Sequence, residues 1–218
     1  MAQFLSDGFD IHYTDTGPGP VNTLLLIHGF SSNSHENWGR TGWVHAVKHK
    51  GLRCVTLDLR GHGKSAKSHD PSAYDRAALA GDVLALMDHL DLQKVDLMGY
   101  SMGAHVALAT AMQAPDRFWN LILGGIGAKM LQPSEPTDGL ALAMEADDPS
   151  TISHPLYQSF RHFADEQGED RLALAACSRS PRSSLDREAL ERLGVPTLVV
   201  AGTRDDLAGD PQGLADVI

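Results

Sequence analysis

The chain alternates short, mostly apolar runs with longer stretches in which apolar residues recur at every third or fourth position. An apolar run is typical of a strand that is buried on both faces, whereas the wider spacing is typical of an amphipathic helix. The runs predict strands over 23–27, 53–57, 95–98, 121–123 and 197–201, and the wider spacing predicts helices over 43–50, 74–90 and 102–114. This order favours an α/β fold, with a mostly parallel sheet and helices on both of its faces.

Two parts of the chain depart from this alternation. Residues 3–6 and 9–14 are separated by Asp7-Gly8, a favoured hairpin turn, so they are expected to form a hairpin at one edge of the sheet. Residues 128–193 contain helix-like segments and no strand pattern, and we interpret them as an inserted helical lid on a core of residues 1–127 and 194–218. The prolines that divide this lid are Pro133, Pro136, Pro149, Pro155 and Pro181.

Composition narrows the class of protein. Apolar residues make up 42% of the 218 positions and charged residues 21%, which predicts one compact globular domain. The formal net charge of −10 makes nucleic acid and anionic membranes unfavourable partners. Because the sequence has neither a secretion signal nor a long apolar run, we expect a cytoplasmic protein that does not span a membrane. Cys54 and Cys177 form no C-x-x-C pattern and are expected to be free thiols.

A Gly-x-Ser-x-Gly pattern joins the predicted strand 95–98 to the predicted helix 102–114. Gly99 and Gly103 flank Ser101 at the positions where a strand turning sharply into a helix leaves no room for a side chain. Such a turn lifts the serine hydroxyl above the sheet edge, where it can act as a nucleophile. The alternative is a serine that only caps the following helix.

Three further motifs follow predicted strands: His28-Gly29-Phe30, Arg60-Gly61-His62-Gly63-Lys64-Ser65 and Gly202-Thr203-Arg204-Asp205. With the Gly-x-Ser-x-Gly turn, they make the chain resemble the α/β-hydrolase family over residues 1–127 and 194–218. The resemblance implies Ser101 as nucleophile and the backbone N–H groups of Phe30 and Met102 as the oxyanion hole. It also implies that His28 and Gly29 position the oxyanion loop and that Asp205 is the acid of a catalytic triad, with Asp206 as the alternative.

The histidine of that triad is missing from its expected place. The family places it after the acid and one further strand, but only thirteen residues follow Asp205 and no histidine follows His162. Three explanations stay open: a longer natural protein, a shortened chain, or a divergent enzyme that uses another histidine. We expect the catalytic histidine, with the C-terminal strand and helix of the family, beyond residue 218. The alternative candidates are His35, His62, His154 and His162.

The predicted lid offers side chains that could shape a substrate pocket. Its apolar candidates are Met130, Leu131, Leu140, Met144, Leu156, Tyr157, Phe160, Phe163, Leu172 and Leu174, and more of them are expected to pack the lid than to line a pocket. Its candidates for binding a substrate carboxylate are Arg161, Arg179, Arg182 and Arg187, with plain surface positions as the alternative. His45 and His49 have the i, i+4 spacing of metal ligands but lack the H-E-x-x-H pattern, so no metal is expected.

The expected function is a cofactor-independent serine hydrolase that cleaves a small-molecule carboxylic ester or lactone through an acyl-enzyme. Thioesterase, C–C hydrolase and cofactor-free perhydrolase chemistry are alternatives within the fold. Epoxide hydrolases and haloalkane dehalogenases typically carry aspartate at the nucleophile position, so Ser101 disfavours both. An alternative of another class is a catalytically silent binding protein, and no oligomeric state follows from the sequence.

Overall fold

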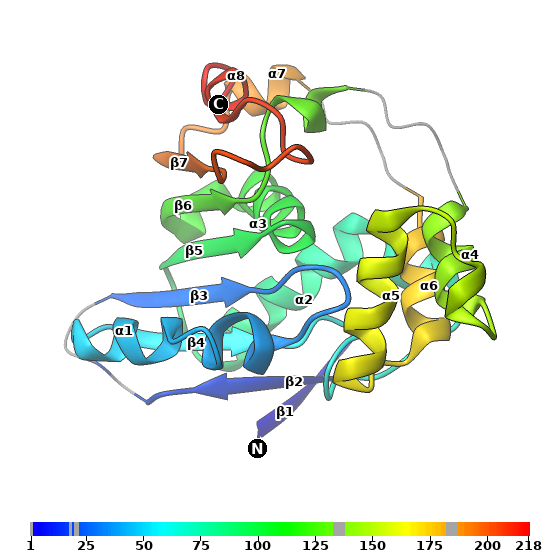
Figure 1. Cartoon of the computed structure of the whole chain (residues 1–218). Helices are drawn as coiled ribbons and strands as arrows, with labels where there is room; N and C mark the ends of the chain where they lie inside the picture. Colours follow the sequence, from blue (N-terminus) through cyan, green and yellow to red (C-terminus); the bar gives the residue numbers. More distant parts are fainter. Residues whose placement is uncertain (1, 18, 20–21, 133–137, 182–186) are drawn as a thin grey trace.

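The computed structural model describes residues 2–17, 19, 22–132, 138–181 and 187–218. Its centre is a seven-stranded sheet in the order β1-β2-β4-β3-β5-β6-β7. The strands are β1 (Ala2–Ser6), β2 (Phe9–Asp15), β3 (Thr23–Ile27), β4 (Arg53–Leu57), β5 (Val95–Tyr100), β6 (Phe118–Gly124) and β7 (Thr197–Val200). From β4 to β7 every pair of neighbours is parallel, and β1 and β2 add an antiparallel hairpin. The predicted mostly parallel sheet and its edge hairpin are confirmed (Figure 1).

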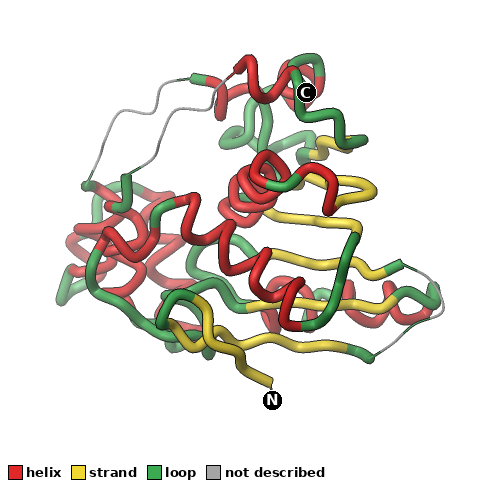
Figure 2. Tube along the Cα trace, turned by 180° about the vertical axis from the view of Figure 1, so that it is seen from behind, coloured by secondary structure: helices red, strands yellow, loops and turns green. Residues whose placement is uncertain are grey.

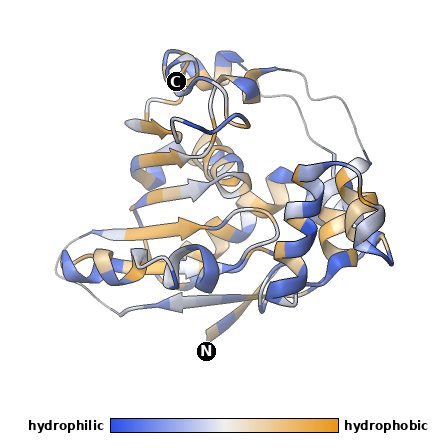
Figure 3. Cartoon of the chain, viewed as in Figure 1, coloured by the Kyte–Doolittle hydropathy of each residue, from blue (hydrophilic) through white to orange (hydrophobic). Residues whose placement is uncertain are grey.

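Helices cover both faces of the sheet, as predicted. α1 (Trp43–His49) packs on one face over a cluster that includes Leu24, Leu26 and Cys54. α2 (Arg76–His89) and α3 (Met102–Gln113) pack on the other face over the larger core, which Figure 2 shows from behind. The apolar colour of the central strands in Figure 3 follows from this double coverage, because each residue of β3 is buried whichever face it points to.

The ends of the predicted helices need one adjustment. α2 begins at Arg76 instead of residue 74, because Pro71–Tyr74 forms a separate 3-10 turn. The side chain of Asp75 then caps α2 by accepting a hydrogen bond from the N–H of Ala77 at 2.7 Å. The remaining short turns are a π-helical turn at His35–Gly39 and 3-10 turns at Pro115–Arg117, Ala128–Leu131 and Pro149–Thr151.

The prediction that β7 is buried on both faces is wrong. β7 lies at the edge of the sheet, and Leu198 and Val200 are 57% and 47% exposed. Its other face packs inward, where Val199 contacts the large core. The apolar run therefore indicated a strand correctly, but it did not reveal that one face lies open at this edge. The short helix α8 (Pro211–Ala215) follows β7 and buries Leu214 in the large core.

Three helices gather beyond the carboxyl ends of β3 and β5, on the right of Figure 1: α4 (Gly139–Glu145), α5 (Pro155–Gln167) and α6 (Arg171–Arg179). Their buried side chains form a small cluster of their own, and Phe30 and Phe160 meet edge to face beside it at 5.7 Å between ring centroids. The flanking Ala128–Leu131 turn instead packs partly buried side chains against the large core, and α7 (Arg187–Glu191) buries Leu190 in it. The division into core and lid at residues 128 and 193 stays a prediction.

Candidate active site

Ser101 sits at the junction of β5 and α3 in a strained backbone conformation, with φ 52° and ψ −117°. Positive φ is uncommon for a residue with a side chain, and such strain persists only where the surroundings impose it. The surroundings here are close backbone contacts on both sides of the turn. A Cβ on Gly99 would lie 2.6 Å from the nitrogen of Ala104, and one on Gly103 would lie 2.7 Å from the carbonyl carbon of Ile27. Glycine at both positions is therefore required by the geometry.

The loop after β3 lies directly against this turn. A Cβ on Gly29 would be 3.4 Å from the Cβ of Ser101, and the N–H of Gly29 donates to Oδ1 of Asn37 at 2.9 Å. Within the described chain, the N–H groups of Phe30 and Met102 donate to no protein acceptor. Two amide donors beside a serine on a strained turn have the chemistry of an oxyanion hole, although their assignment to that role stays a prediction.

His28 and His62 form a buried layer behind this loop, with ring centroids 5.2 Å apart. Nε2 of His28 accepts the N–H of Leu59 at 3.0 Å, so Nδ1 carries the proton and donates to the carbonyl oxygen of Gly29 at 2.8 Å. Burial holds the pKa of His28 below its usual value and lowers the pKa of His62 to about 3. Both imidazoles are therefore neutral. Both nitrogens of His28 are occupied, one by Gly29 in the loop after β3 and the other by Leu59 in the loop after β4.

Two buried carboxylates hold the neighbouring loops. Asp58 accepts the N–H of Ser34 on Oδ1 at 2.8 Å, and on Oδ2 the N–H of Lys64 at 2.9 Å and Nδ1 of His12 at 3.1 Å. Burial raises the pKa of Asp58, but the nearby His28 and the hydrogen bonds from Ser34 and Lys64 together lower it by more, so the pKa lies below its usual value. Glu169, between α5 and α6, accepts the N–H of Gly63 at 2.8 Å, which ties the predicted lid to the core.

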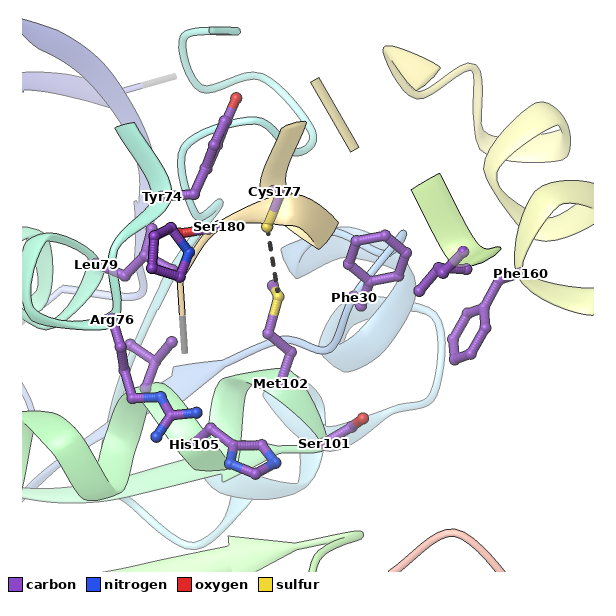
Figure 4. A pocket seen from close by; sticks show the side chains of 13 residues that line it. Phe30, Tyr74, Arg76, Leu79, Ser101, Met102, His105, Phe160, Cys177 and Ser180 are labelled. Carbon is purple, nitrogen blue, oxygen red and sulfur yellow. Dashed lines mark hydrogen bonds between the residues drawn. The ribbon is translucent and has the colours of Figure 1, made fainter. Parts of the chain in front are cut away.

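A cavity of about 240 Å³ opens beside Ser101 (Figure 4). Its walls come from the loop after β3, from α2, α3 and α4, and from α5 and the end of α6. The residues that line it are Phe30, Tyr74, Arg76, Leu79, Ser101, Met102, His105, Val106, Leu140, Phe160, Cys177, Ser180 and Pro181. Met102 and Cys177 meet across the cavity, with their sulfur atoms 3.9 Å apart. The space is mostly apolar, with a few polar groups, as is usual for a small-molecule site.

Asp205 follows β7, as the resemblance implies, but it does not line this cavity. Its Oδ1 accepts the N–H groups of Leu207 and Ala208, both at 3.0 Å, so the carboxylate shapes the turn in which it lies. Asp206 is exposed in the same turn. Neither aspartate bonds to a histidine among the described residues, and the choice between them as triad acid stays a prediction.

None of the four alternative histidines lines the cavity of Ser101. His62 is buried behind the loop, His35 and His162 have side chains 79% and 77% exposed, and His154 stacks on Tyr157. The histidine that does line it is His105, one turn along α3, which the sequence reasoning missed. Its i+4 spacing from Ser101 was the available signal.

Some of the apolar candidates from the predicted lid line the cavity, and others pack the helices together. Leu140 and Phe160 line the cavity, whereas Met144 and Leu174 pack the helices together. The arginine candidates that the structure describes serve other contacts, because Arg161 bonds to Asp165 and to the carbonyls of Ala143 and Ala146, Arg179 pairs with Glu145, and Arg187 pairs with Glu191. Arg182 lies outside the described residues.

A different cation lines the cavity. Arg76, the first residue of α2, was not singled out from the sequence. The pattern around it predicted only a helix start, and its neighbours across the cavity come from α3 and from the residues after α6. These residues meet only through tertiary packing, so no local motif could have grouped them.

The structural findings on metal sites and membrane spans cover the described residues alone. His45 and His49 stack on α1 with ring centroids 6.4 Å apart, and no group of three or more histidine, cysteine, aspartate or glutamate side chains in this part of the chain could hold a metal ion. No described helix has the length and apolar character needed to cross a bilayer. Cys54 and Cys177 are both buried, and neither forms a disulfide among the described residues.

Two known proteins of similar sequence are hydrolases. A 2-hydroxy-6-oxononadienedioate/2-hydroxy-6-oxononatrienedioate hydrolase of Cupriavidus pinatubonensis is 37% identical over 145 residues, which are 62% of this chain and 46% of that protein. An epoxide hydrolase of Caballeronia sordidicola is 34% identical over 113 residues, which are 52% of this chain and 33% of that protein. The chain thus spans less than half the length of either relative.

The fold has close counterparts among solved structures. The enol-lactonase of Burkholderia xenovorans superposes with a TM-score of 0.79 at 24% identity, over 99% of this chain and 86% of that one. The family model described as alpha/beta hydrolase fold matches residues 22–153, which is more than half of the chain and includes the Ser101 turn and the loop of His28, Gly29 and Phe30. The sheet order, the strained turn and this match agree, and the chain belongs to the alpha/beta hydrolase fold family.

Proposed function

We propose that this protein is a serine hydrolase that cleaves a small-molecule carboxylic ester or lactone through an acyl-enzyme. The observation that carries the proposal is the strained turn at Ser101 beside a mostly apolar cavity. Next to this turn, the backbone N–H groups of Phe30 and Met102 donate to no acceptor within the described chain. A hydroxyl held in this way can reach a carbonyl carbon, and the amides can receive the negative charge that develops on the carbonyl oxygen.

The reaction has two halves. Ser101 Oγ loses its proton to a histidine and bonds to the carbonyl carbon, and the resulting oxyanion accepts the N–H groups of Phe30 and Met102. The intermediate then collapses, and the alkoxide leaves with the proton that the histidine returns. In the second half, water attacks the acyl group by the same route and releases the acid. Asp205 orients the histidine, which we place beyond residue 218.

The two relatives support hydrolysis in general, but they do not single out an ester or a lactone as the substrate. The Cupriavidus relative acts, by its name, on a dienedioate or trienedioate, so C–C bond hydrolysis at the same serine is a second candidate. The epoxide hydrolase relative is a weaker guide to the reaction, because Ser101 stands where that class typically uses aspartate to form its covalent ester.

A burst assay tests the role of Ser101. With 4-nitrophenyl butyrate and protein that includes the catalytic histidine, we expect rapid release of about one nitrophenolate per protein molecule, because the acyl-enzyme forms before it is hydrolysed. Ser101→Ala should abolish the burst, whereas Ser159→Ala, at an exposed hydroxyl on α5 that bonds to the carbonyl of Pro155, should keep it. An equal burst in Ser101→Ala would refute the nucleophile assignment, and no burst in any form would favour the silent binding protein.

A further inference from the structure

Phe30 lies in a backbone segment whose conformation depends on contacts from outside the segment. Gly29 precedes it, and Ser31 follows it with φ 53°, which is uncommon for a residue with a side chain. Glycine makes other backbone conformations easy to reach, and a strained residue keeps its conformation only where its surroundings impose it. The direction of the Phe30 N–H group therefore depends in part on what holds the Phe30 side chain.

The Phe30 ring is held from two sides. The ring of His62, from the loop after β4, lies edge to face with it at 5.8 Å between centroids. The ring of Phe160, from α5, lies edge to face with it at 5.7 Å. Edge-to-face pairs at this distance are favourable and fix the angle between the rings. Without Phe160, the Phe30 ring would keep only its aromatic contact with the core.

The side chain of Met102 is also held from outside the sheet. Sγ of Cys177, on α6, donates a hydrogen bond to Sδ of Met102 at 3.9 Å, which Figure 4 marks with a dashed line. Cys177 is 8% exposed, so this contact is buried. Met102 begins α3 directly after the strained Ser101, and its N–H group is the second predicted oxyanion donor. Each predicted donor residue therefore has its side chain against α5 or α6.

These contacts bear on catalysis because an oxyanion donor acts only at the right distance from the developing charge, and a small displacement lowers the rate strongly. We infer that Phe160 and Cys177 are positioning residues, which hold the two predicted oxyanion donors in place through the side chains of Phe30 and Met102. The alternative is that Phe160 and Cys177 only line the acyl pocket. The inference rests on the proposed function for the role of the two N–H groups, but the order of these groups can be measured without turnover.

The first test uses nuclear magnetic resonance relaxation of the backbone amides and needs no substrate. In the unchanged chain we expect the N–H groups of Phe30 and Met102 to have order parameters in the rigid range, near about 0.85. Phe160→Ala should lower the order parameter of Phe30 toward about 0.6, and Cys177→Ala should lower that of Met102 by a smaller amount, because a sulfur–sulfur hydrogen bond is weak.

Matched controls separate these contacts from a general loosening. Phe163→Ala removes the same ring from α5, at a position that does not line the cavity. Cys54→Ala removes a buried thiol from the cluster under α1 on the opposite face of the sheet. Both controls should leave the order parameters of Phe30 and Met102 unchanged.

The second test measures acylation, with protein that includes the catalytic histidine. Stopped-flow kinetics with 4-nitrophenyl acetate and butyrate give the acylation rate constant and the half-saturating concentration for each ester. Phe160→Ala should lower the rate constant about tenfold or more, by a similar factor for both esters, because the oxyanion forms at the same place whatever the length of the acyl chain. The half-saturating concentrations should change little. If Phe160 only lined the pocket, binding of the butyrate would weaken more than binding of the acetate, and the rate constants would stay.

Conservative variants complete the test. Phe160→Leu keeps an apolar side chain against Phe30 and should recover part of the rate. Cys177→Ser keeps a donor toward Met102 and should recover most of the smaller loss that we expect in Cys177→Ala. The melting temperature shows whether each variant is folded. If an alanine variant does not fold, its conservative partner takes its place, with the same expected direction and a smaller size.

Three results would overturn the inference: unchanged order parameters in the variants of Phe160 and Cys177, a loss confined to binding of the butyrate, or an equal loss of rate in Phe163→Ala. The proposed function fails separately, through the absence of a burst in the unchanged protein. Lower order parameters without any burst would refute only the hydrolase, and a burst with unchanged order parameters would refute only the positioning role.

Discussion

His62 is a fully buried imidazole beneath the loop that carries Phe30, and its ring lies edge to face with the Phe30 ring at 5.8 Å between centroids. Its Nδ1 donates to the carbonyl oxygen of Arg60 at 3.1 Å, and its Nε2 has no partner among the described residues. Protonation would place a second N–H on that unpartnered nitrogen, in a space without an acceptor. The depressed pKa of about 3 follows mainly from burial, with the neighbouring His28 adding to the effect.

This neutral imidazole makes stability depend on pH. In the unfolded chain His62 takes up a proton near pH 6.5, whereas in the folded chain its pKa is about 3. The contribution of His62 to the free energy of unfolding is therefore complete above pH 6.5 and is lost as pH falls toward 3, by up to about 1.4 kcal/mol per pH unit. We expect His62→Asn to flatten this dependence between pH 7.5 and pH 5, measured by urea unfolding at each pH.

His162→Asn is the matched control, because that side chain is 77% exposed on α5 and should leave the slope unchanged. His28 has its pKa lowered by burial as well, so part of the slope will remain in His62→Asn. The same slope in His62→Asn and the unchanged protein would contradict the prediction.

Helix α2 is fastened to the core by a buried ion pair. Nη2 and Nε of Arg60 donate to the two carboxylate oxygens of Asp82 at 2.6 and 2.7 Å, and the two side chains are 2% and 0% exposed. Asp82 also accepts the hydroxyl of Ser6 at 2.6 Å, so the pair joins α2 to edge strand β1 and to the loop after β4. Each charge depends on the other, because burial removes the water that would solvate either one alone.

Asp82→Ala should lower the free energy of unfolding by about 3–5 kcal/mol, because it leaves the buried guanidinium of Arg60 with only the exposed carboxylate of Asp7, at 3.8 Å, as counter-charge. On the same helix, Asp88 pairs with Arg117 at 2.8 Å, but its side chain is 68% exposed. Asp88→Ala should therefore cost about 1 kcal/mol or less. Urea unfolding of the two variants measures both values, and a similar small loss in each would show that the buried pair adds little.

The spacing of apolar residues predicted most of the helices and strands of this fold, because that spacing is a local signal. β3 and α3 match their predicted ranges closely, since a run of four apolar residues after Thr23 and a proline stop are local signals. β7 shows the limit, because the exposure of Leu198 depends on what covers the strand and not on its own sequence. β6 shows another, since Phe118–Gly124 is longer than the apolar run at 121–123 that indicated it.

At the scale of the whole molecule, the sequence predicts that some residues of the site lie together, but it gives no signal for others. Ser101 and Gly29 sit in motifs whose spacing is local, so their approach follows from strand order in a parallel sheet. Arg76, His105 and Ser180 come from three separate segments, and only the packing of α6 on the core places them around one cavity. The position of the triad histidine stays a prediction.

The helices α5 and α6 are held to this core by two neighbouring acidic residues. Glu169 is 8% exposed, and it accepts Nδ2 of Asn33 at 3.0 Å as well as the N–H of Gly63 at 2.8 Å. Asp170 lies 3.1 Å from Nε2 of His69 on the core, with both side chains more exposed. Asn33 belongs to the loop that carries Phe30, so Glu169 joins α5 and α6 to that loop through a single carboxylate.

Glu169→Ala should therefore loosen α5, α6 and the loop after β3 together. It removes the acceptor for Asn33 and Gly63, and each buried donor left unpaired costs about 1–3 kcal/mol. Because that cost falls on a local contact, we expect amide hydrogen exchange in residues 30–34, 61–65 and α6 to become about tenfold faster or more, while exchange in β3 and β5 stays slow. Glu166→Ala removes the same charge from an exposed position on α5 and should leave exchange in all of these segments unchanged. Faster exchange in α6 alone would show that Glu169 holds this helix but not the loop after β3. Unchanged exchange in all segments would show that Asp58 and His28 hold the loop without a contribution from Glu169.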